Sequence, residues 1–155
     1  MSADFDPERD LTITRIIRAP RARLWQAWTD PAQLARWFLP EPSILRVDRL
    51  EVRPGGALLT AMSENGGSFN PHIDGLFLDV EEGRRLVFTN VVTSSFRPAD
   101  PGFMTAIISF EDHPDGTDYT AHVMHRSPAD RQMHEEAGFE DGWGTVAAQL
   151  AKLVE

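Results

Sequence analysis

The first forty residues restrict the fold more than any other part of the chain. An alternating run from Leu11 to Ile17 predicts a half-buried strand, which ends near Pro20. Two short helical stretches follow, divided at Asp30 and ending before Pro40. Asp30 is expected to cap the second helix, because its carboxylate accepts unpaired amide hydrogens and the proline after it loses no helical hydrogen bond at the first position. The sequence therefore predicts one strand followed by two short helices.

Residues 41–126 carry a series of short apolar runs separated by glycine and proline. Such breaks favour hairpin connections, so neighbouring strands are expected to pair antiparallel. The predicted strands lie at residues 44–52, 57–62, 73–80, 85–93, 103–111 and 118–126.

The last segment has the pattern of an amphipathic helix. Ser127 is the expected N-cap and Pro128 the first helical residue. A single helix from about Pro128 to Val154 would be about 40 Å long, enough to cross a small sheet. Its apolar positions recur at steps of three and four, which is typical of one helix face: Phe139, Trp143, Val146, Leu150 and Leu153.

These elements predict an α+β protein in which a curved antiparallel sheet wraps around a long C-terminal helix. We expect a flexible tail over residues 1–9 and a single domain over residues 10–155. The run from Leu11 to Phe38 resembles the start of proteins similar to the activator of the heat-shock protein 90 ATPase, within the START-like (SRPBCC) superfamily. The segment from Phe139 to Trp143 is similar to the closing helix of that family. The resemblance implies a helix-grip fold that holds a hydrophobic cavity.

Composition excludes several classes of function. The net charge is −9 and the arginines are scattered, which disfavours nucleic-acid binding because that binding depends on neutralising phosphates. No apolar run approaches the roughly 18 residues of a membrane span, and the acidic N-terminus has no apolar run of a secretory signal, so a cytoplasmic protein is expected. The chain has no cysteine, hence no disulfide and no thiol nucleophile.

No motif predicts a metal, a cofactor or a nucleophile. His122 and His125 lie three residues apart on a predicted strand and should point to opposite faces, so they cannot share a metal ion. No paired histidines with helical metal-binding spacing, no GxSxG and no phosphate-binding glycine loop are present in the sequence. A non-catalytic protein is therefore favoured, with catalysis left open.

The predicted closing helix contains Gly138, Gly142 and Gly144, each of which costs about 1 kcal/mol relative to alanine. Either close packing on the sheet or a cavity beneath the helix explains them. The resemblance favours the cavity. Apolar side chains would then bind the ligand, Asn90, Tyr119 or His125 would orient its polar end, and Phe69 and the loop at 94–102 are candidate lids. The expected apolar contacts are Trp37, Met62, Phe88, Met104, Met133 and Trp143.

The sequence thus predicts that the protein binds a small, largely apolar ligand. One alternative is a co-chaperone that regulates a heat-shock protein 90 type ATPase, with a chaperone as partner. Another is a cyclase or lyase that acts on an aromatic or polyketide-like substrate, with His125 or Asp79 transferring a proton. Monomer and homodimer both remain open.

Overall fold

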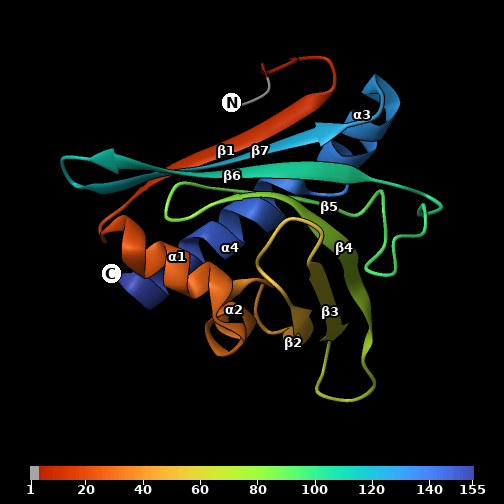
Figure 1. Cartoon of the computed structure of the whole chain (residues 1–155), viewed down its shortest axis with the longest axis horizontal. Coiled ribbons are helices and arrows are strands. Elements are labelled where there is room, and N and C mark those ends of the chain that lie inside the picture. Colours follow the sequence, from red (N-terminus) through yellow and green to blue (C-terminus); the bar gives the residue numbers. More distant parts are fainter. Residues whose placement is uncertain (1–3) are drawn as a thin grey trace.

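The sheet places the first strand of the chain beside the last. In the computed structural model, which describes residues 4–155, seven antiparallel strands lie in the order β1-β7-β6-β5-β4-β3-β2 (Figure 1). The edges are therefore β1 and β2, and helices α1 and α2 connect them. The strands are β1 (Asp10–Ile17), β2 (Ile44–Leu50), β3 (Ala57–Ser63), β4 (Asn70–Glu81), β5 (Arg85–Thr89), β6 (Met104–His113) and β7 (Gly116–His125), and the helices are α1 (Arg21–Thr29), α2 (Pro31–Trp37), α3 (Pro128–Glu136) and α4 (Phe139–Val154).

One face of this sheet forms the core. In the register of β6 and β7, Phe110 lies opposite Tyr119 and Ile108 lies opposite Ala121. Because side chains alternate along each strand, both pairs point to this face. Helices α1, α2 and α4 cover this face (Figure 1). Strand alternation predicts an inward-facing set along β5, β6 and β7, of which only Asn90 and Val92, just beyond β5, are half-buried. The other members are buried: Leu86, Phe88, Met104, Ala106, Ile108, Phe110, Tyr119, Ala121, Val123 and His125. The predicted α+β helix-grip fold is confirmed.

The second short helix begins as its sequence predicts. The side chain of Asp30 accepts a hydrogen bond from the amide of Ala32 and caps α2, with Pro31 in the first helical position. The helices bury Trp28 and Trp37, whose rings pack edge to face with centroids 5.1 Å apart. The ring of Trp28 also lies 5.9 Å from that of Phe88 on β5, so these aromatic side chains join the two helices to the core face of the sheet.

The predicted single C-terminal helix is wrong: the structure divides it. Helix α3 ends at Glu136, and Gly138 adopts a left-handed conformation with φ of 100° before α4 begins. A residue in that conformation cannot continue a right-handed helix. The sixteen residues of α4 span about 24 Å rather than 40 Å. No residue of α3 is fully buried, so packing does not hold the two helices in line.

The described part of the predicted N-terminal tail contacts β7. The amide of His125 donates to the carbonyl oxygen of Arg9, and the ring of Phe5 lies 5.4 Å from that of His122. Residues 1–3 of the predicted tail lie outside the described residues. Within residues 4–155, no helix has the length and apolar character needed to cross a membrane.

Candidate functional site

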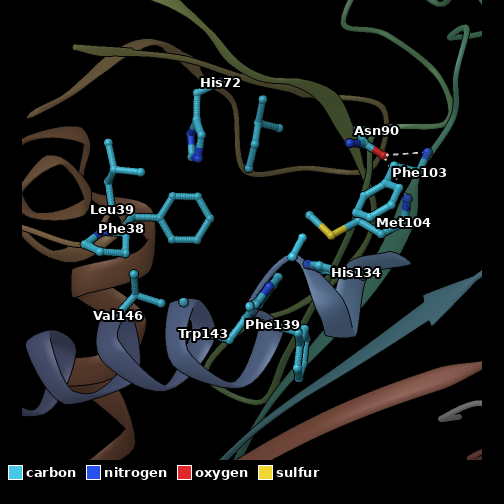
Figure 2. A pocket seen from close by; sticks show the side chains of 15 residues that line it. Phe38, Leu39, His72, Asn90, Phe103, Met104, His134, Phe139, Trp143 and Val146 are labelled. Atoms are coloured by element: carbon cyan, nitrogen blue, oxygen red, sulfur yellow. Dashed lines mark hydrogen bonds between the residues drawn. The ribbon is translucent and has the colours of Figure 1, made fainter. Parts of the chain in front are cut away.

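A pocket of about 400 Å³ lies between the start of α4 and the sheet. Its walls come from segments far apart in the sequence, which Figure 2 shows around one hollow. They are the segment after α2, the beginning of β4, the two ends of the loop between β5 and β6, and the junction of α3 with α4. The lining residues are Phe38, Leu39, Pro40, His72, Ile73, Asn90, Phe103, Met104, His134, Ala137, Gly138, Phe139, Gly142, Trp143 and Val146.

Two glycines at the helix junction leave space for this pocket. Gly138 and Gly142 both line it, and a Cβ atom placed on either would meet no atom within 4 Å. A Cβ on Gly144 would also meet nothing, but Gly144 does not line the pocket. The backbone at Gly138 and Gly142 therefore leaves space beside α4, while Phe139 between them is buried.

Aromatic rings form most of the apolar wall. Phe139 and Trp143 stack with centroids 5.7 Å apart, one turn from each other on α4. On the opposite side, the ring of Phe38 packs edge to face against Trp28 and Phe88 of the core. The aromatic wall is thus braced from behind and presents a fixed shape to a ligand.

The side chain of Asn90 supplies a donor to the pocket. Its Oδ1 accepts hydrogen bonds from the amides of Phe103 and Met104 at 3.2 and 2.9 Å. These bonds orient the amide group, since only the oxygen can accept. Figure 2 shows the nitrogen of Asn90 turned away from these bonds, toward the hollow.

The pocket also contains two histidines with depressed basicity. Burial lowers the pKa of His72, whose Nδ1 lies 2.9 Å from the hydroxyl of Thr60. Burial, and then the charge of His125, lower the pKa of His134 to about 4. Both rings are consequently neutral at physiological pH, and the pocket presents polar groups without a formal charge.

The structure brings three of the ten predicted site residues together at the pocket: Asn90, Met104 and Trp143. His125 lies directly behind its wall, with Nε2 2.8 Å from Nδ1 of the lining residue His134. The remaining six lie elsewhere.

Trp37, Phe88 and Tyr119 are fully buried core side chains that do not line the pocket. Among them, Trp37 donates its indole hydrogen to the carbonyl of Ala27 at 3.0 Å. These rings face inward as strand alternation and helix spacing require, but other side chains separate them from the hollow.

Met62, Phe69 and Met133 also lie outside the pocket lining. Met62 is half-buried on β3, and Met133 is exposed on α3. The guanidinium carbon of Arg46 lies over the ring of Phe69, 4.7 Å from the ring centroid. This loop residue thus has a partner outside the pocket.

Of the two residues considered for proton transfer, Asp79 has a structural partner outside the pocket. Asp79 forms an ion pair with Arg85 across the β4–β5 hairpin and does not line the pocket. Residues 94–102 of the candidate lid do not line it either. No group of three or more potential metal ligands occurs within the part of the chain that the structure describes.

Sequence reasoning missed His72, Phe38, Phe103 and His134. One signal could have found the last of these. Four lining residues recur at steps of four, a spacing that the predicted single helix would place on one face. They are His134, Gly138, Gly142 and Val146.

Comparison with known proteins adds family and fold relatives. A family model described as Activator of Hsp90 ATPase homolog 1-like protein matches residues 18–155. A crystal structure of a Nitrosomonas europaea protein is similar, with 39% identity, a TM-score of 0.86 and 96% of each chain covered. A Mycobacterium smegmatis protein has 26% identity and a TM-score of 0.80, with 100% of this chain and 96% of that chain covered. No curated protein matches the chain.

An NMR structure of an AHSA1-like protein from Aeromonas hydrophila shares the fold, with 22% identity and a TM-score of 0.68. The match covers 94% of this chain and 95% of that chain.

Proposed function

The chain belongs to the family of activator of Hsp90 ATPase homolog 1-like proteins, and we propose that it binds a small, largely apolar ligand in the pocket beneath α4. The resemblance seen near both ends of the sequence is thereby confirmed. The observation that carries the proposal is the pocket itself: about 400 Å³, walled by braced aromatic rings and left open by Gly138 and Gly142. Pockets of roughly 300 to 1,000 Å³ with few polar groups are typical of small-molecule sites.

The chemistry of the lining favours an uncharged ligand. Among the lining residues only His72 and His134 have ionisable side chains, and burial lowers the pKa of both, so neither is charged at physiological pH. A ligand that buries about 200 Å² of apolar surface would gain about 5 kcal/mol from contact with the aromatic wall. Asn90 would then orient a polar end, because its amide nitrogen faces the hollow (Figure 2).

The proposal is tested by filling the pocket from α4. Gly142→Leu places a side chain in the hollow, whereas Gly144→Leu places the same side chain on the same helix outside the pocket lining. Leucine is a better helix former than glycine, so both variants should fold. Binding is measured by the fluorescence of N-phenyl-1-naphthylamine, an uncharged apolar probe.

We expect Gly142→Leu to weaken probe binding at least tenfold and Gly144→Leu to leave it unchanged. Wild-type affinity in Gly142→Leu would contradict binding at this pocket. Native mass spectrometry of protein purified from its own host identifies a retained ligand, and the same retained mass should be missing from Gly142→Leu.

Family membership favours a second candidate, regulation of a heat-shock protein 90 type ATPase. That function needs a protein surface rather than the hollow. Stimulation of the chaperone's ATP hydrolysis by wild type and by Gly142→Leu alike would support it, and no stimulation at saturating protein would reject it.

A further inference from the structure

Two histidines form a hydrogen-bonded chain that leads from β1 to the pocket. Nδ1 of His125 lies 2.8 Å from the carbonyl oxygen of Arg9, and Nε2 of His125 lies 2.8 Å from Nδ1 of His134. His134 lines the pocket and His125 does not. Within residues 4–155, Nε2 of His134 has no hydrogen-bond partner and is not sealed from solvent. This nitrogen is the end of the chain that a ligand can meet.

When both rings are neutral, the carbonyl group of Arg9 determines where their hydrogens lie. A carbonyl oxygen only accepts, so Nδ1 of His125 carries a hydrogen. In a neutral imidazole the other nitrogen then has none, and Nε2 of His125 is an acceptor. Nδ1 of His134 must donate to it, which leaves Nε2 of His134 without a hydrogen. Nε2 of His134 is therefore a hydrogen-bond acceptor in the pocket lining.

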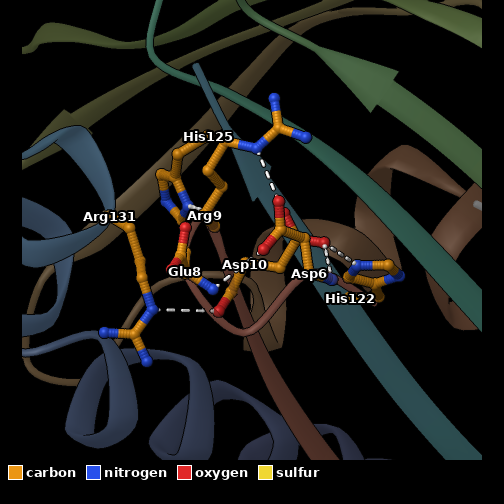
Figure 3. A network of polar contacts seen from close by, with 7 residues as sticks. All are labelled: Asp6, Glu8, Arg9, Asp10, His122, His125 and Arg131. Carbon is orange, nitrogen blue, oxygen red and sulfur yellow. Dashed lines mark hydrogen bonds and ion pairs between the residues drawn. The ribbon is translucent and has the colours of Figure 1, made fainter. Parts of the chain in front are cut away.

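Contacts to both β7 and α3 fix the Arg9 end of this hydrogen-bonded chain. The carbonyl oxygen of Arg9 also accepts from the backbone amide of His125 at 3.1 Å, as part of the strand pairing. The guanidinium group of Arg9 pairs with Asp6 at 2.7 Å, and Nε of Arg131 on α3 donates to the carbonyl of Asp10 at 3.1 Å (Figure 3). These contacts tie the start of β1 to both β7 and α3, the elements that carry the two histidines.

The apolar surroundings of His134 strengthen any hydrogen bond that its Nε2 accepts. Its ring packs between Phe103 and Phe139, with centroids 4.7 and 5.0 Å away. Burial lowers the pKa of His134 to about 4, so the ring stays neutral at physiological pH. A hydrogen bond in such apolar surroundings is stronger than in water, and an acceptor left unpaired is costly.

We propose that Nε2 of His134 selects, among small apolar molecules, those that carry a neutral hydroxyl or N–H donor. Ethers and carboxylates of the same shape offer this nitrogen only acceptors and bind more weakly. The inference rests on the proposed function, because it concerns the ligand of the same pocket. Asn90 complements it by offering a donor on another wall.

The hydrogen positions are measured by long-range proton–nitrogen NMR correlation at pH 8, without any ligand. We expect His125 and His134 to carry their hydrogens on Nδ1, with Nε2 unprotonated in both. The His134→Phe variant assigns the signals by their loss. A hydrogen on Nε2 of His134 would overturn the inference whatever the pocket binds.

Selectivity is measured by calorimetry at pH 7.5 with 1-naphthol and 1-methoxynaphthalene, which differ in the hydroxyl hydrogen. We expect naphthol to bind about five- to tenfold more tightly, as one added hydrogen bond implies. His134→Phe should abolish this preference while the ether still binds, and His72→Phe, which removes the other imidazole of the pocket, should retain it.

The outcomes separate the inference from the proposed function. Equal affinities of wild type for the two probes would overturn the donor selectivity and leave the binding function standing. Binding of neither probe would count against the binding function, and the selectivity would fall with it.

Discussion

The indole nitrogen of Trp28 donates a hydrogen bond to the phenolic oxygen of Tyr119 at 3.2 Å, with both side chains buried in the core. The bond connects α1 to β7 across ninety residues of sequence. Burial raises the pKa of Tyr119, so the phenol stays protonated. The bond gives Tyr119, a predicted ligand contact, a structural role behind the pocket.

Replacing Tyr119 with Phe should therefore weaken the fold and leave ligand binding intact. The buried indole of Trp28 would lose its acceptor, which costs about 1 to 3 kcal/mol. Urea denaturation measures the loss, and N-phenyl-1-naphthylamine fluorescence measures binding. A normal stability with lost binding would instead place Tyr119 at the ligand.

Alanine should have opposite effects at two glycines near the helix junction. At Gly138 the left-handed backbone makes Gly138→Ala destabilising by at least about 1 kcal/mol. At Gly144 the added methyl group meets no atom, so Gly144→Ala should stabilise by up to about 1 kcal/mol. Thermal unfolding of the two variants gives the signs, and an equal shift in the same direction would contradict the junction geometry.

Gln149 should matter for both stability and the pocket, because its side chain joins α4 to the segment after α2. Its Nε2 donates to the carbonyls of Trp37 and Leu39, each at 2.9 Å, and its Oε1 accepts from the amide of Glu41 at 2.9 Å. Removing these bonds should cost about 1 to 3 kcal/mol and loosen the wall formed by residues 38–40.

We therefore expect Gln149→Ala to weaken probe binding and to speed hydrogen exchange at the amide of Glu41. Gln132 provides the control, since within residues 4–155 its side chain bonds only to the exposed Glu136 on the same helix. Equal probe binding and equal hydrogen exchange in Gln132→Ala and Gln149→Ala would show that the hydrogen bonds of Gln149 have no influence on the pocket.

The stability of the fold should depend on His134 in mildly acidic solution. The pKa of His134 is about 4 in the folded protein and about 6.5 in an unfolded chain, so the unfolded state binds the proton first. The stabilising contribution is complete above pH 6.5 and is lost progressively as the pH falls to 4. His134→Phe should lose less stability across that interval.

Melting temperatures at pH 7, 6, 5 and 4 provide the comparison. Arg21 lowers the pKa of the Asp112 carboxyl below its usual value. The stabilising contribution of that carboxylate is therefore lost only below this pH interval, and equally in both proteins. Parallel curves for wild type and His134→Phe would exclude a buried, neutral histidine at this position.

The sequence by itself determined the strands, the first two helices and their order, because local signals suffice for them, but it did not show the break at Gly138 that divides the C-terminal helix. Asp30 and Ser127 cap helices whose first residue is proline, and alternation put Phe110, Tyr119 and Ala121 on the buried face. The resemblance near both ends of the chain led to the family for the same reason: those residues build the helices and their caps.

Tertiary structure alone decided which inward-facing side chains meet the pocket. Phe88 and Met104 both face inward, yet Phe88 is sealed behind Phe38 and only Met104 lines the hollow. Strand alternation specifies a face, but not how many layers of side chains cover it. His134 is a similar case, since its role depends on His125 and Arg9, which reach it only through the pairing of β1 with β7 and the packing of α3.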